Sequence, residues 1–597
     1  LNRLFVFAAL VLAAYAPATA GSDPVADYLA WRGEGLAAIH ALTLDGDVDA
    51  SGLHGTDKQS ATPARLRDEF DFSVLKGVTV ISEAGAWETT MSGQVRTLSL
   101  DAKITAARRL DLLFATPLRA GRGKTLPDET KDGVSYRVVH VDYGDGDAHD
   151  YFIASDGALP FVRITQDTDV SWMALSDWRT VDGVKFAFKE SLTYEEAMRN
   201  ATIAWRSIAA RASTDDAAFA RPAAGRQVVS FPSGDAPAIP IKLFRDSYIV
   251  LPITVNGVAT NALLDSGAEA TALDATFAET AGIAATGALP ASGAGGYQTA
   301  GIASGVTIET VGAALRDITP AIIDLSALSA AFGMPINAIV GQELFNEAVV
   351  EVDYAGLTVR FHDAATFAPR EGTTVALVPH HGGLRQIEAS VEGHPPGLFD
   401  FDTGNGGYTA ISGYAADDWK LLDGRPASDV LTGGVGGQSV TTVVTASELA
   451  FAGVTRTNVP VTIGGASGGS HDTKRLAGNL GAAVFKRFRL WIDFAHDRLT
   501  LLPNPERIAL PFDRDRCGLG FGFTKEGLAI SHVAKASPAE AAGVTVGTIV
   551  RGINGSAVDR VSWAERLRGA CRAPAGGNAV LSFDNGKTVT LPLRDYF

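Results

Sequence analysis

The chain has 597 residues, of which 46% are hydrophobic and 20% charged, and its formal net charge is −16. This length is too great for one hydrophobic core, so several domains are expected. The negative charge argues against nucleic acid as a partner, because phosphate binding needs a basic surface. The 64 glycines favour a β-rich architecture with many turns.

The first 20 residues have the pattern of a secretory signal peptide. Arg3 precedes an apolar run from Leu4 to Tyr15, and Ala18 to Ala20 form a small-x-small cleavage pattern. An uncleaved membrane anchor is the alternative, although the run is short for a span. No later stretch approaches the roughly 20 continuous apolar residues that a spanning helix needs. The sequence therefore predicts export to the periplasm or beyond, with no transmembrane anchor in the mature chain.

Residues 21–228 are predicted to form an N-terminal domain that is β-rich or α+β. A helix is expected near Tyr28 to Ala41, followed by alternating strand-like runs such as VSYRVVHVDY and VKFAFKESLTY, with turn signals between them. The segment SDWRTVDGVKFAFKE loosely resembles strands of the periplasmic lipoprotein-carrier type of half-open barrel. No chemical motif accompanies this resemblance, so the role of the domain stays open, with lipid carriage as one alternative.

Residues 240–505 contain an internal repeat. In each copy two predicted strands lead into an acidic turn, LLDSGAEA (263–270) in the first and FDTGNGGY (401–408) in the second. A glycine-rich turn and a further pair of strands follow in both copies. Three landmarks, Gly341, Phe345 and Asp353, recur 140 positions later as Gly481, Phe485 and Asp493. The constant offset predicts two related lobes, at residues 240–368 and 369–505.

Asp265 and Asp402 occupy matching places in the two turns. Two carboxylates within hydrogen-bonding reach cannot both ionise cheaply, so they share a proton. The ionised group can take a proton from water, while the protonated group polarises a carbonyl and then protonates a leaving amine. Glycine permits the tight turn, and a hydroxyl can hydrogen-bond across the interface. The supporting turn residues are Ser266, Gly267, Thr403 and Gly404. One such turn alone would most simply be structural, but its duplication favours catalysis.

These motifs resemble those of the pepsin- and retropepsin-like aspartic proteases in their two-lobed, single-chain form. LLDSGA and DFDTGN match the catalytic loops of that family, and AIVGQELF and GNLGAAVF look like the apolar elements that brace them. The resemblance implies a mainly β, bilobal, pseudo-twofold pair of barrels that cleaves peptides or proteins with Asp265 and Asp402. It implies no cofactor and no metal.

The same resemblance implies a flap over the substrate in the first glycine-rich turn, with Gly295, Gly296 and Tyr297 as candidates. An ordinary exposed turn tyrosine is the alternative for Tyr297. Asn405 departs from the family pattern, which has a small or hydroxyl residue there. Asp400 departs as well, because an apolar residue is usual two positions before the catalytic Asp. By strand alternation Asp400 faces the same side as Asp402 and would perturb the dyad; a solvated strand residue is the alternative.

Other catalytic chemistries find little support in the sequence. There is no HExxH motif, and the adjacent pair His380-His381 lacks the spacing of a helical zinc site, so loop histidines are predicted. The serines of GASGGS (465–470) lie in a Gly/Ser-rich stretch that is predicted to be a loop, so no nucleophile elbow is expected there.

Residues 515–597 begin with Gly518, Leu519, Gly520 and Phe521, the pattern of a carboxylate-binding loop. Together with SPAEAAGV and INGSAV, this loop resembles the PDZ modules of bacterial periplasmic proteases, which implies binding of protein C-terminal tails. A small β-rich cap is the alternative. Cys517 and Cys571 are the two cysteines of the chain, and a disulfide between them would tie the loop to the region after a predicted helix, VSWAERLRGA; two free thiols are the alternative.

The sequence as a whole predicts an exported aspartic endopeptidase with a PDZ module. The alternative is a non-catalytic peptide-binding or scaffold protein with a degenerate protease fold. Substitution of either Asp265 or Asp402 by Asn separates the two.

Overall fold

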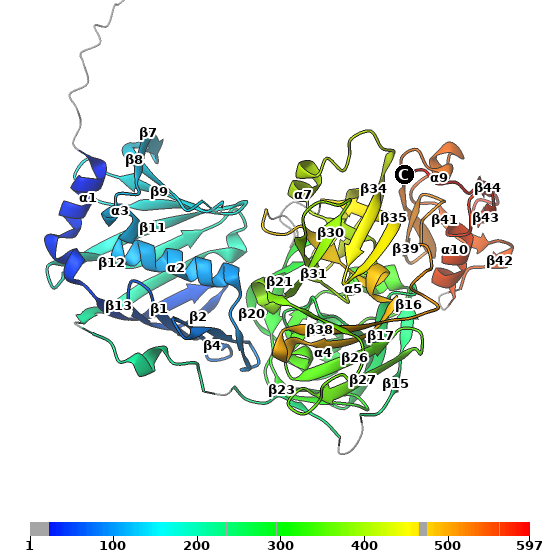
Figure 1. The fold of residues 1–597 in the computed structure, drawn as a ribbon, viewed down its shortest axis with the longest axis horizontal. Coiled ribbons are helices and arrows are strands. Elements are labelled where there is room, and N and C mark those ends of the chain that lie inside the picture. The colour runs from blue at the N-terminus through cyan, green and yellow to red at the C-terminus, as the bar shows by residue number, and fades with distance from the viewer. Residues whose placement is uncertain are drawn as a thin grey trace, which may run out of the picture.

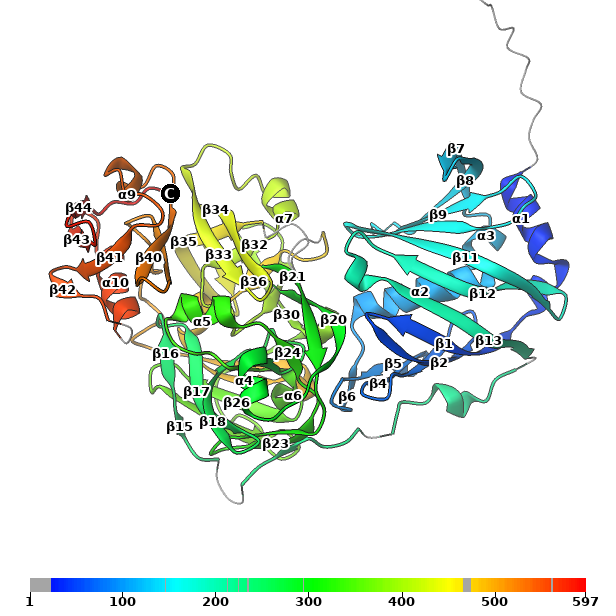
Figure 2. The same cartoon turned by 180° about the vertical axis from the view of Figure 1, so that it is seen from behind.

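The structure is a computed structural model that describes residues 23–597 apart from 145, 212, 224, 233–235, 294, 465–473 and 560–561. The predicted signal peptide lies outside the described residues. The chain is mainly β and multidomain: a blue-to-cyan sheet stands at one end, green and yellow halves form the centre, and an orange-to-red part lies at the other end (Figures 1 and 2). Among the described residues, no helix combines the length and apolarity needed to cross a membrane.

A single antiparallel sheet of 13 strands forms the N-terminal part. Helix α2 runs across one face of this sheet (Figure 1). It buries Leu110, Leu113 and Phe114 against the strands, and this burial supplies much of the core of this part. In spatial order the strands are β6 (Val95–Thr97), β5 (Gly85–Thr89), β4 (Lys76–Ser82), β3 (Leu66–Asp71), β2 (Leu53–Ala61), β1 (Ala41–Ala50), β13 (Ala201–Arg211), β12 (Val184–Thr193), β11 (Asp169–Val181), β10 (Phe161–Gln166), β9 (Ala148–Ile153), β8 (Val134–Asp142) and β7 (Lys124–Lys131).

The first helix ends earlier than predicted. Helix α1 covers Pro24–Arg32, a 3-10 turn follows, and strand β1 begins at Ala41. The cause is Gly33, whose φ of 117° is open to glycine and whose Cβ, if present, would lie 2.2 Å from the carbonyl oxygen of Gly183. Helix propagation stops at this close approach.

The helices of the chain are short. They are α1 (Pro24–Arg32), η1 (Glu34–Ala38), α2 (Leu100–Phe114), α3 (Thr116–Arg119), η2 (Ala197–Arg199), η3 (Asp216–Phe219), α4 (Ala275–Thr280), α5 (Ser326–Phe332), α6 (Gln342–Phe345), η4 (His381–Gly383), α7 (Gly413–Asp418), α8 (Ala482–Phe485), η5 (Phe494–His496), α9 (Pro538–Ala541) and α10 (Trp563–Cys571).

The central part repeats one sheet topology. We call residues 240–368 lobe 1 and residues 369–505 lobe 2. In lobe 1, β18 runs parallel to β25, which pairs antiparallel with β19; in lobe 2, β31, β36 and β32 repeat this arrangement. The first sheet contains β14 (Val229–Ser230), β23 (Ala314–Ile318), β22 (Val306–Glu309), β17 (Tyr248–Val255), β18 (Val258–Leu264), β25 (Ala338–Val340), β19 (Ala272–Asp274), β24 (Ala321–Ile323), β21 (Gly296–Ile302) and β20 (Thr286–Gly293), with β16 (Lys242–Phe244) on β17. The second contains β29 (Val378–Pro379), β30 (Arg385–Val391), β31 (Gly397–Phe401), β36 (Gly478–Leu480), β32 (Thr409–Ile411), β35 (Val454–Ile463), β34 (Gly437–Phe451) and β33 (Ala427–Gly434).

A six-stranded sheet joins the two lobes. At its centre β26 of lobe 1 pairs antiparallel with β37 of lobe 2. Its order is β15 (Ile239–Pro240), β27 (Thr358–Asp363), β26 (Ala348–Asp353), β37 (Phe488–Asp493), β38 (Arg498–Pro503) and β28 (Thr373–Ala376). Buried apolar side chains from both lobes therefore contribute to one continuous cluster.

The C-terminal part is a small six-stranded sheet with two short helices. Its strands are β39 (Leu519–Phe523), β40 (Leu528–Val533), β41 (Ile549–Ile553), β43 (Asn578–Phe583) and β44 (Thr588–Pro592), with β42 (Ser556–Ala557) on β41. A disulfide joins Cys517, just before β39, to Cys571 at the end of α10, and the two Cα atoms are 5.1 Å apart.

Candidate active site

The two acidic turns leave equivalent strands in the same way. Asp265 follows β18 and donates its backbone N–H to Val340 of β25 at 3.0 Å, and Asp402 follows β31 and donates to Leu480 of β36 at 3.1 Å. Each carboxylate then accepts the N–H of the glycine two residues later, at 2.8 Å in lobe 1 and 2.7 Å in lobe 2. The strand pair and the turn thus fix both aspartates in matching orientations.

Ser266 and Thr403 lock the two turns together. The backbone N–H of each residue donates to the hydroxyl of the other, at 2.9 and 3.0 Å. The Ser266 hydroxyl donates to the carbonyl of Phe401 and the Thr403 hydroxyl to that of Leu264, at 3.3 and 3.2 Å. Both side chains are buried, so each hydroxyl serves as donor and acceptor away from water.

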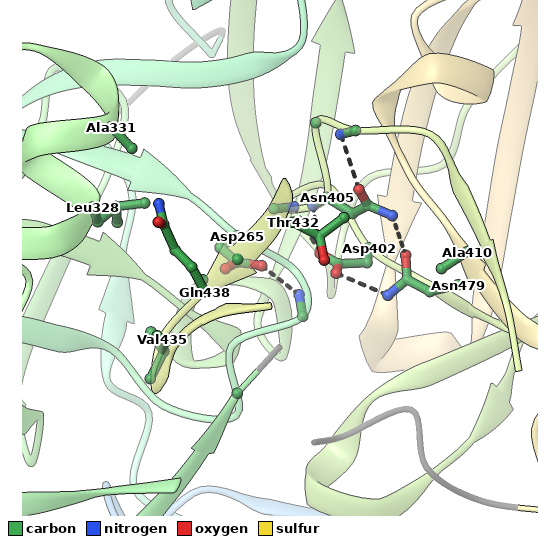
Figure 3. Close-up of a pocket in the computed structure, with 18 of the residues that line it drawn as sticks. Asp265, Leu328, Ala331, Asp402, Asn405, Ala410, Thr432, Val435, Gln438 and Asn479 are labelled. Carbon is green, nitrogen blue, oxygen red and sulfur yellow. Dashed lines mark hydrogen bonds between the residues drawn. The ribbon is translucent and has the colours of Figure 1, made fainter. Parts of the chain in front are cut away.

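The locked turns bring the two carboxyl groups face to face (Figure 3). A Cβ on Gly404 would lie 2.3 Å from Cγ of Asp265, and one on Gly267 would lie 2.7 Å from Oδ1 of Asp402. Each acid therefore packs on the glycine of the opposite turn, where no other residue fits. Withdrawal from water, and next the negative charge of Asp402, raise the pKa of Asp265 well above its usual range. The structure thus brings the sequence-predicted pair together with all four supporting residues.

A polar network surrounds Asp402 and was missed in the sequence. Asn479 of β36 donates through Nδ2 to Oδ2 of Asp402 at 2.9 Å, and the Asn405 amide donates to Oδ1 of Asn479 at 2.7 Å (Figure 3). The backbone N–H of Asn405 also reaches Oδ1 of Asp402, at 3.1 Å. The available signal was the polar residue in GNLG, where the lobe 1 copy reads AIVG.

Asp400 is buried, with 1% of its surface exposed, so the alternative of a solvated strand residue is wrong. Its Oδ1 lies 3.0 Å from Nδ1 of His380, and Nε2 of the same ring lies 3.0 Å from Oδ2 of Asp101 on α2. Burial by itself lowers the pKa of His380, but the hydrogen bonds to the two carboxylates outweigh it and raise this pKa to about 9. His380, predicted as a loop histidine, therefore links the N-terminal part to the strand behind Asp402, and its raised pKa favours the imidazolium form at neutral pH.

Two glycine turns, one from each lobe, meet across the cleft. In lobe 1 the turn joins β20 to β21, and in lobe 2 it joins β33 to β34. The N–H of Gly295 donates to the carbonyl of Val435 at 2.9 Å, and a Cβ on Gly295 would lie 2.2 Å from the backbone nitrogen of Gly437. Sequence reasoning named the lobe 1 turn alone as a flap candidate. Tyr297 lies against Arg199 of the N-terminal part, whose guanidinium is 5.5 Å from its ring centre.

The dyad lies in a cavity of about 1120 Å³ that all parts of the chain line. Leu328 and Ala331 of α5 and Val435 of the lobe 2 turn lie around Asp265 (Figure 3). Asp101 and Arg199 contribute from the N-terminal part, and residues 518–521 from the C-terminal part. The cavity therefore extends from the dyad to residues of both the N-terminal and the C-terminal parts.

Residues 518–521 begin the edge strand β39. Asp515 holds the start of this loop by accepting the N–H groups of Cys517 and Gly518, at 3.0 and 2.9 Å. The end of α5 in lobe 1 packs between β39 and α10: a Cβ on Gly333 would lie 2.6 Å from Nε1 of Trp563. Lobe 1 therefore covers part of the groove between this strand and this helix.

Within the described ranges, the one group of potential metal ligands that comes together is Asp515, Cys517 and Cys571. Both sulfurs are joined in the disulfide, which leaves a single carboxylate. This group is not a metal site.

Comparison with known proteins supports an aspartic-protease fold. A family model described as aspartyl protease matches residues 251–344, which include Asp265. The chain is similar to a crystal structure of an aspartic proteinase from Irpex lacteus, with 15% identity and a TM-score of 0.30, over 46% of this chain and 99% of that one. It is also similar to a retropepsin-like aspartic protease from Rickettsia conorii, with 22% identity and a TM-score of 0.17, over 22% of this chain and 100% of that one.

A different solved structure, a LolA superfamily protein from Nitrosomonas europaea, is similar at 11% identity with a TM-score of 0.25, over 33% of this chain and 96% of that one. No curated protein matches the chain.

Proposed function

We propose that this chain is an exported aspartic endopeptidase in which Asp265 and Asp402 activate a water molecule to hydrolyse peptide bonds. The observation that carries the proposal is the pair of facing carboxyl groups on duplicated turns, locked by Ser266 and Thr403. The aspartyl-protease family match over one of these turns supports it. An inherited but inactive fold would not need to keep both acids within a large cavity.

The chemistry follows from a shared proton. The ionised carboxylate takes a proton from water as the oxygen attacks the carbonyl carbon, and the protonated acid gives its proton to the carbonyl oxygen. Collapse of the tetrahedral intermediate returns one proton to the leaving nitrogen and the other to the dyad. No covalent intermediate with the protein forms. The two glycine turns cover the cleft and limit the access of water, which strengthens the electrostatic interactions within it.

The test is cleavage of a peptide library by the full chain, with a pepstatin-type inhibitor as a control. Asp265→Asn and Asp402→Asn should each lower kcat by at least about 1000-fold while leaving thermal unfolding close to that of the wild type. Asp128→Asn is a matched control, because Asp128 is exposed on β7, far from the dyad in the sequence and on another sheet. Cleavage that persists in either dyad variant would favour the non-catalytic scaffold.

We further propose that the C-terminal part is a PDZ module that binds the carboxylate of protein C-terminal tails. Residues 518–521 line the cavity at the start of an edge strand, and a peptide can add there as a further strand beside the part of the groove that α5 covers. Binding to the full chain should be seen for a peptide with a free C-terminal carboxylate and lost for the same peptide with a C-terminal amide. Equal binding of both peptides would exclude this mode of recognition.

A further inference from the structure

The two catalytic turns differ in what lies next to them. In lobe 1, the residues paired behind the turn are Leu263 and Ile339, which are both apolar. In lobe 2, Asp400 and Asn479 occupy the same register positions. The backbone is the same, but one acid is backed by hydrocarbon and the other by an amide.

Among the described residues, the side-chain amide of Asn479 is the main difference between the hydrogen bonds that the two acids receive. Backbone N–H groups donate to both carboxyl groups, from Gly267 at Asp265 and from Gly404 and Asn405 at Asp402. The N–H of Ala268 donates to the main-chain carbonyl oxygen of Asp265, at 3.4 Å. The Nδ2 of Asn479 is an additional donor at Asp402. In the described part of the chain, no side-chain amide donates to Asp265. A donor stabilises a carboxylate more than a carboxylic acid, so this third N–H favours ionisation of Asp402.

The orientation of the Asn479 amide is fixed by its neighbours. Its Oδ1 accepts from Nδ2 of Asn405 at 2.7 Å, so its Nδ2 must face the carboxylate. The Asn405 side chain is fixed in turn, because its Oδ1 accepts the N–H of Gly407 at 3.0 Å. Asn479 is also 2% exposed, so water does not compete for its amide. The amide can only donate to Oδ2 of Asp402, which excludes a proton pointing from that oxygen toward Asn479.

We propose that Asn479, oriented by Asn405, is a positioning residue that keeps Asp402 ionised and leaves the shared proton on Asp265. This inference rests on the proposed protease function. Asp402 is then the general base that takes the proton of water, and Asp265 gives its proton to the substrate carbonyl oxygen. In the second step Asp402 passes its proton to the leaving nitrogen as the C–N bond breaks, and Asp265 recovers its proton from a hydroxyl of the intermediate.

The other titratable groups around Asp402 do not supply this asymmetry. Tyr248 of β17 interacts with both acids, and burial, the main cause, raises its pKa above the usual range. Burial does the same for Tyr354, so both phenols stay neutral at acid and neutral pH. Asp400 is paired with His380, which Asp101 also contacts. Asn479 is thus the group whose removal should change Asp402 most directly.

The experiment is the pH dependence of kcat/KM for the full chain and for Asn479→Ala. Loss of the third donor should move the acid limb, set by ionisation of the dyad, to higher pH by about one unit. The alkaline limb, set by loss of the proton from Asp265, should move less. Asn405→Ala, which leaves Asn479 in place but free to turn, should shift the acid limb in the same direction by a smaller amount. A purely structural role would lower kcat without moving the limb.

The outcomes separate this inference from the proposed function. A wild-type enzyme that cleaves peptides, together with an unmoved acid limb in both variants, would overturn the role of Asn479 and leave the protease proposal standing. A wild-type chain without peptidase activity would overturn both. Thermal unfolding of each variant, compared with that of Asp128→Asn, shows whether the protein has folded. If Asn479→Ala does not fold, the Asn405→Ala profile decides.

Discussion

The two acidic turns share a backbone but have different attachments to the N-terminal part of the chain. Beside the first turn, Arg96 of β6 donates to Glu269 at 2.9 Å and to the side chain of Gln342 at 3.0 Å. Behind the second, Asp101 of α2 pairs with His380, which pairs with Asp400. The repeat therefore supplies the geometry of the dyad, whereas the side chains that the repeat does not share attach each turn to its surroundings.

The lobe 1 attachment includes the short helix α6, which follows β25. Glu343 of α6 is 2% exposed and accepts from the N–H and hydroxyl of Thr271, at 2.8 and 2.9 Å, and from the hydroxyl of Ser92 at 3.2 Å. Gln94 donates to the carbonyl of the same residue at 2.9 Å. Residues 92–96 thus hold the element that braces the first turn. The N-terminal part therefore contacts the surroundings of both acidic turns.

We call the contacts of Arg96 with Glu269 and Gln342 the lobe 1 clamp. Its removal should have the largest effect on stability. Arg96→Ala breaks the largely buried ion pair with Glu88 and also removes the cation beside the more exposed Glu269. The change should cost about 3 to 5 kcal/mol in the free energy of unfolding, most of it from the buried pair. Denaturant unfolding measures the loss, and Arg206→Ala is the control because its side chain pairs with Asp45 at the surface. Equal small losses in both variants would show that Arg96 does not clamp the turn.

The pairing of His380 with Asp101 and Asp400, which we call the lobe 2 clamp, should make the stability of the protein depend on pH. His380 has a folded-state pKa of about 9, above its ordinary value of 6.5. The stabilisation of the folded state by the protonated His380 should be complete below about pH 6.5 and disappear as the pH rises through about 9. It should add at most about 3 kcal/mol to the free energy of unfolding. This stabilisation is measured as the difference in melting temperature between the wild type and His380→Gln, followed from about pH 6 to about pH 10. Parallel curves would contradict it.

Breaking the hydrogen bonds between Ser266 and Thr403 should cost less stability than the loss of Arg96. It should nevertheless lower activity more for each kcal/mol of stability lost. Thr403→Val keeps the shape and leaves the N–H of Ser266 and the carbonyl of Leu264 without the Thr403 hydroxyl. The free energy of unfolding should fall by about 1 to 3 kcal/mol. Peptide hydrolysis should fall by at least about tenfold, because the carboxyl groups lose their alignment. Thr403→Ser restores the hydroxyl, and failure of Ser to restore activity would argue against the lock.

The smallest effect is expected at Tyr297. Its ring lies against Arg199, so Tyr297→Phe should change kcat/KM by less than about threefold. Gly295→Val is the matched change in the same turn, since any Cβ there meets the backbone of Gly437 and should separate the two turns. A large loss in Tyr297→Phe would instead assign the hydroxyl to the substrate.

The sequence allowed prediction of what the repeat encodes. The offset between copies indicated two turns and a strand pair behind each, because the same local pattern dictates the same local structure twice. It also placed Asp400 on the side of Asp402 through strand alternation. The partners of Asp400 could not be predicted, because His380 and Asp101 come from separate parts of the chain and no periodicity connects them. Asn479 was overlooked because a single polar residue in an apolar strand carries no pattern of its own.

The predicted end of the first helix was wrong because of a contact that is distant in sequence. The carbonyl of Gly183 packs against Gly33, which has a positive φ and ends the helix. The contact between the two glycine turns was equally invisible. The glycines are needed because the backbones of the two turns lie too close together for side chains, as at Gly295 beside Val435 and Gly437. The sequence of one turn does not reveal that the other turn lies against it.

The six-stranded sheet between the lobes has a consequence for biosynthesis. Strand β26 is completed with lobe 1, but its partner β37 belongs to the last stretch of lobe 2, so the ribosome must deliver nearly the whole second lobe before the two can pair. Until then the nascent chain carries an open strand edge with Val349, Val350 and Val352, which are fully covered in the finished protein. Any chain in which lobe 2 is incomplete therefore presents this edge to other chains, and we expect it to be prone to aggregation.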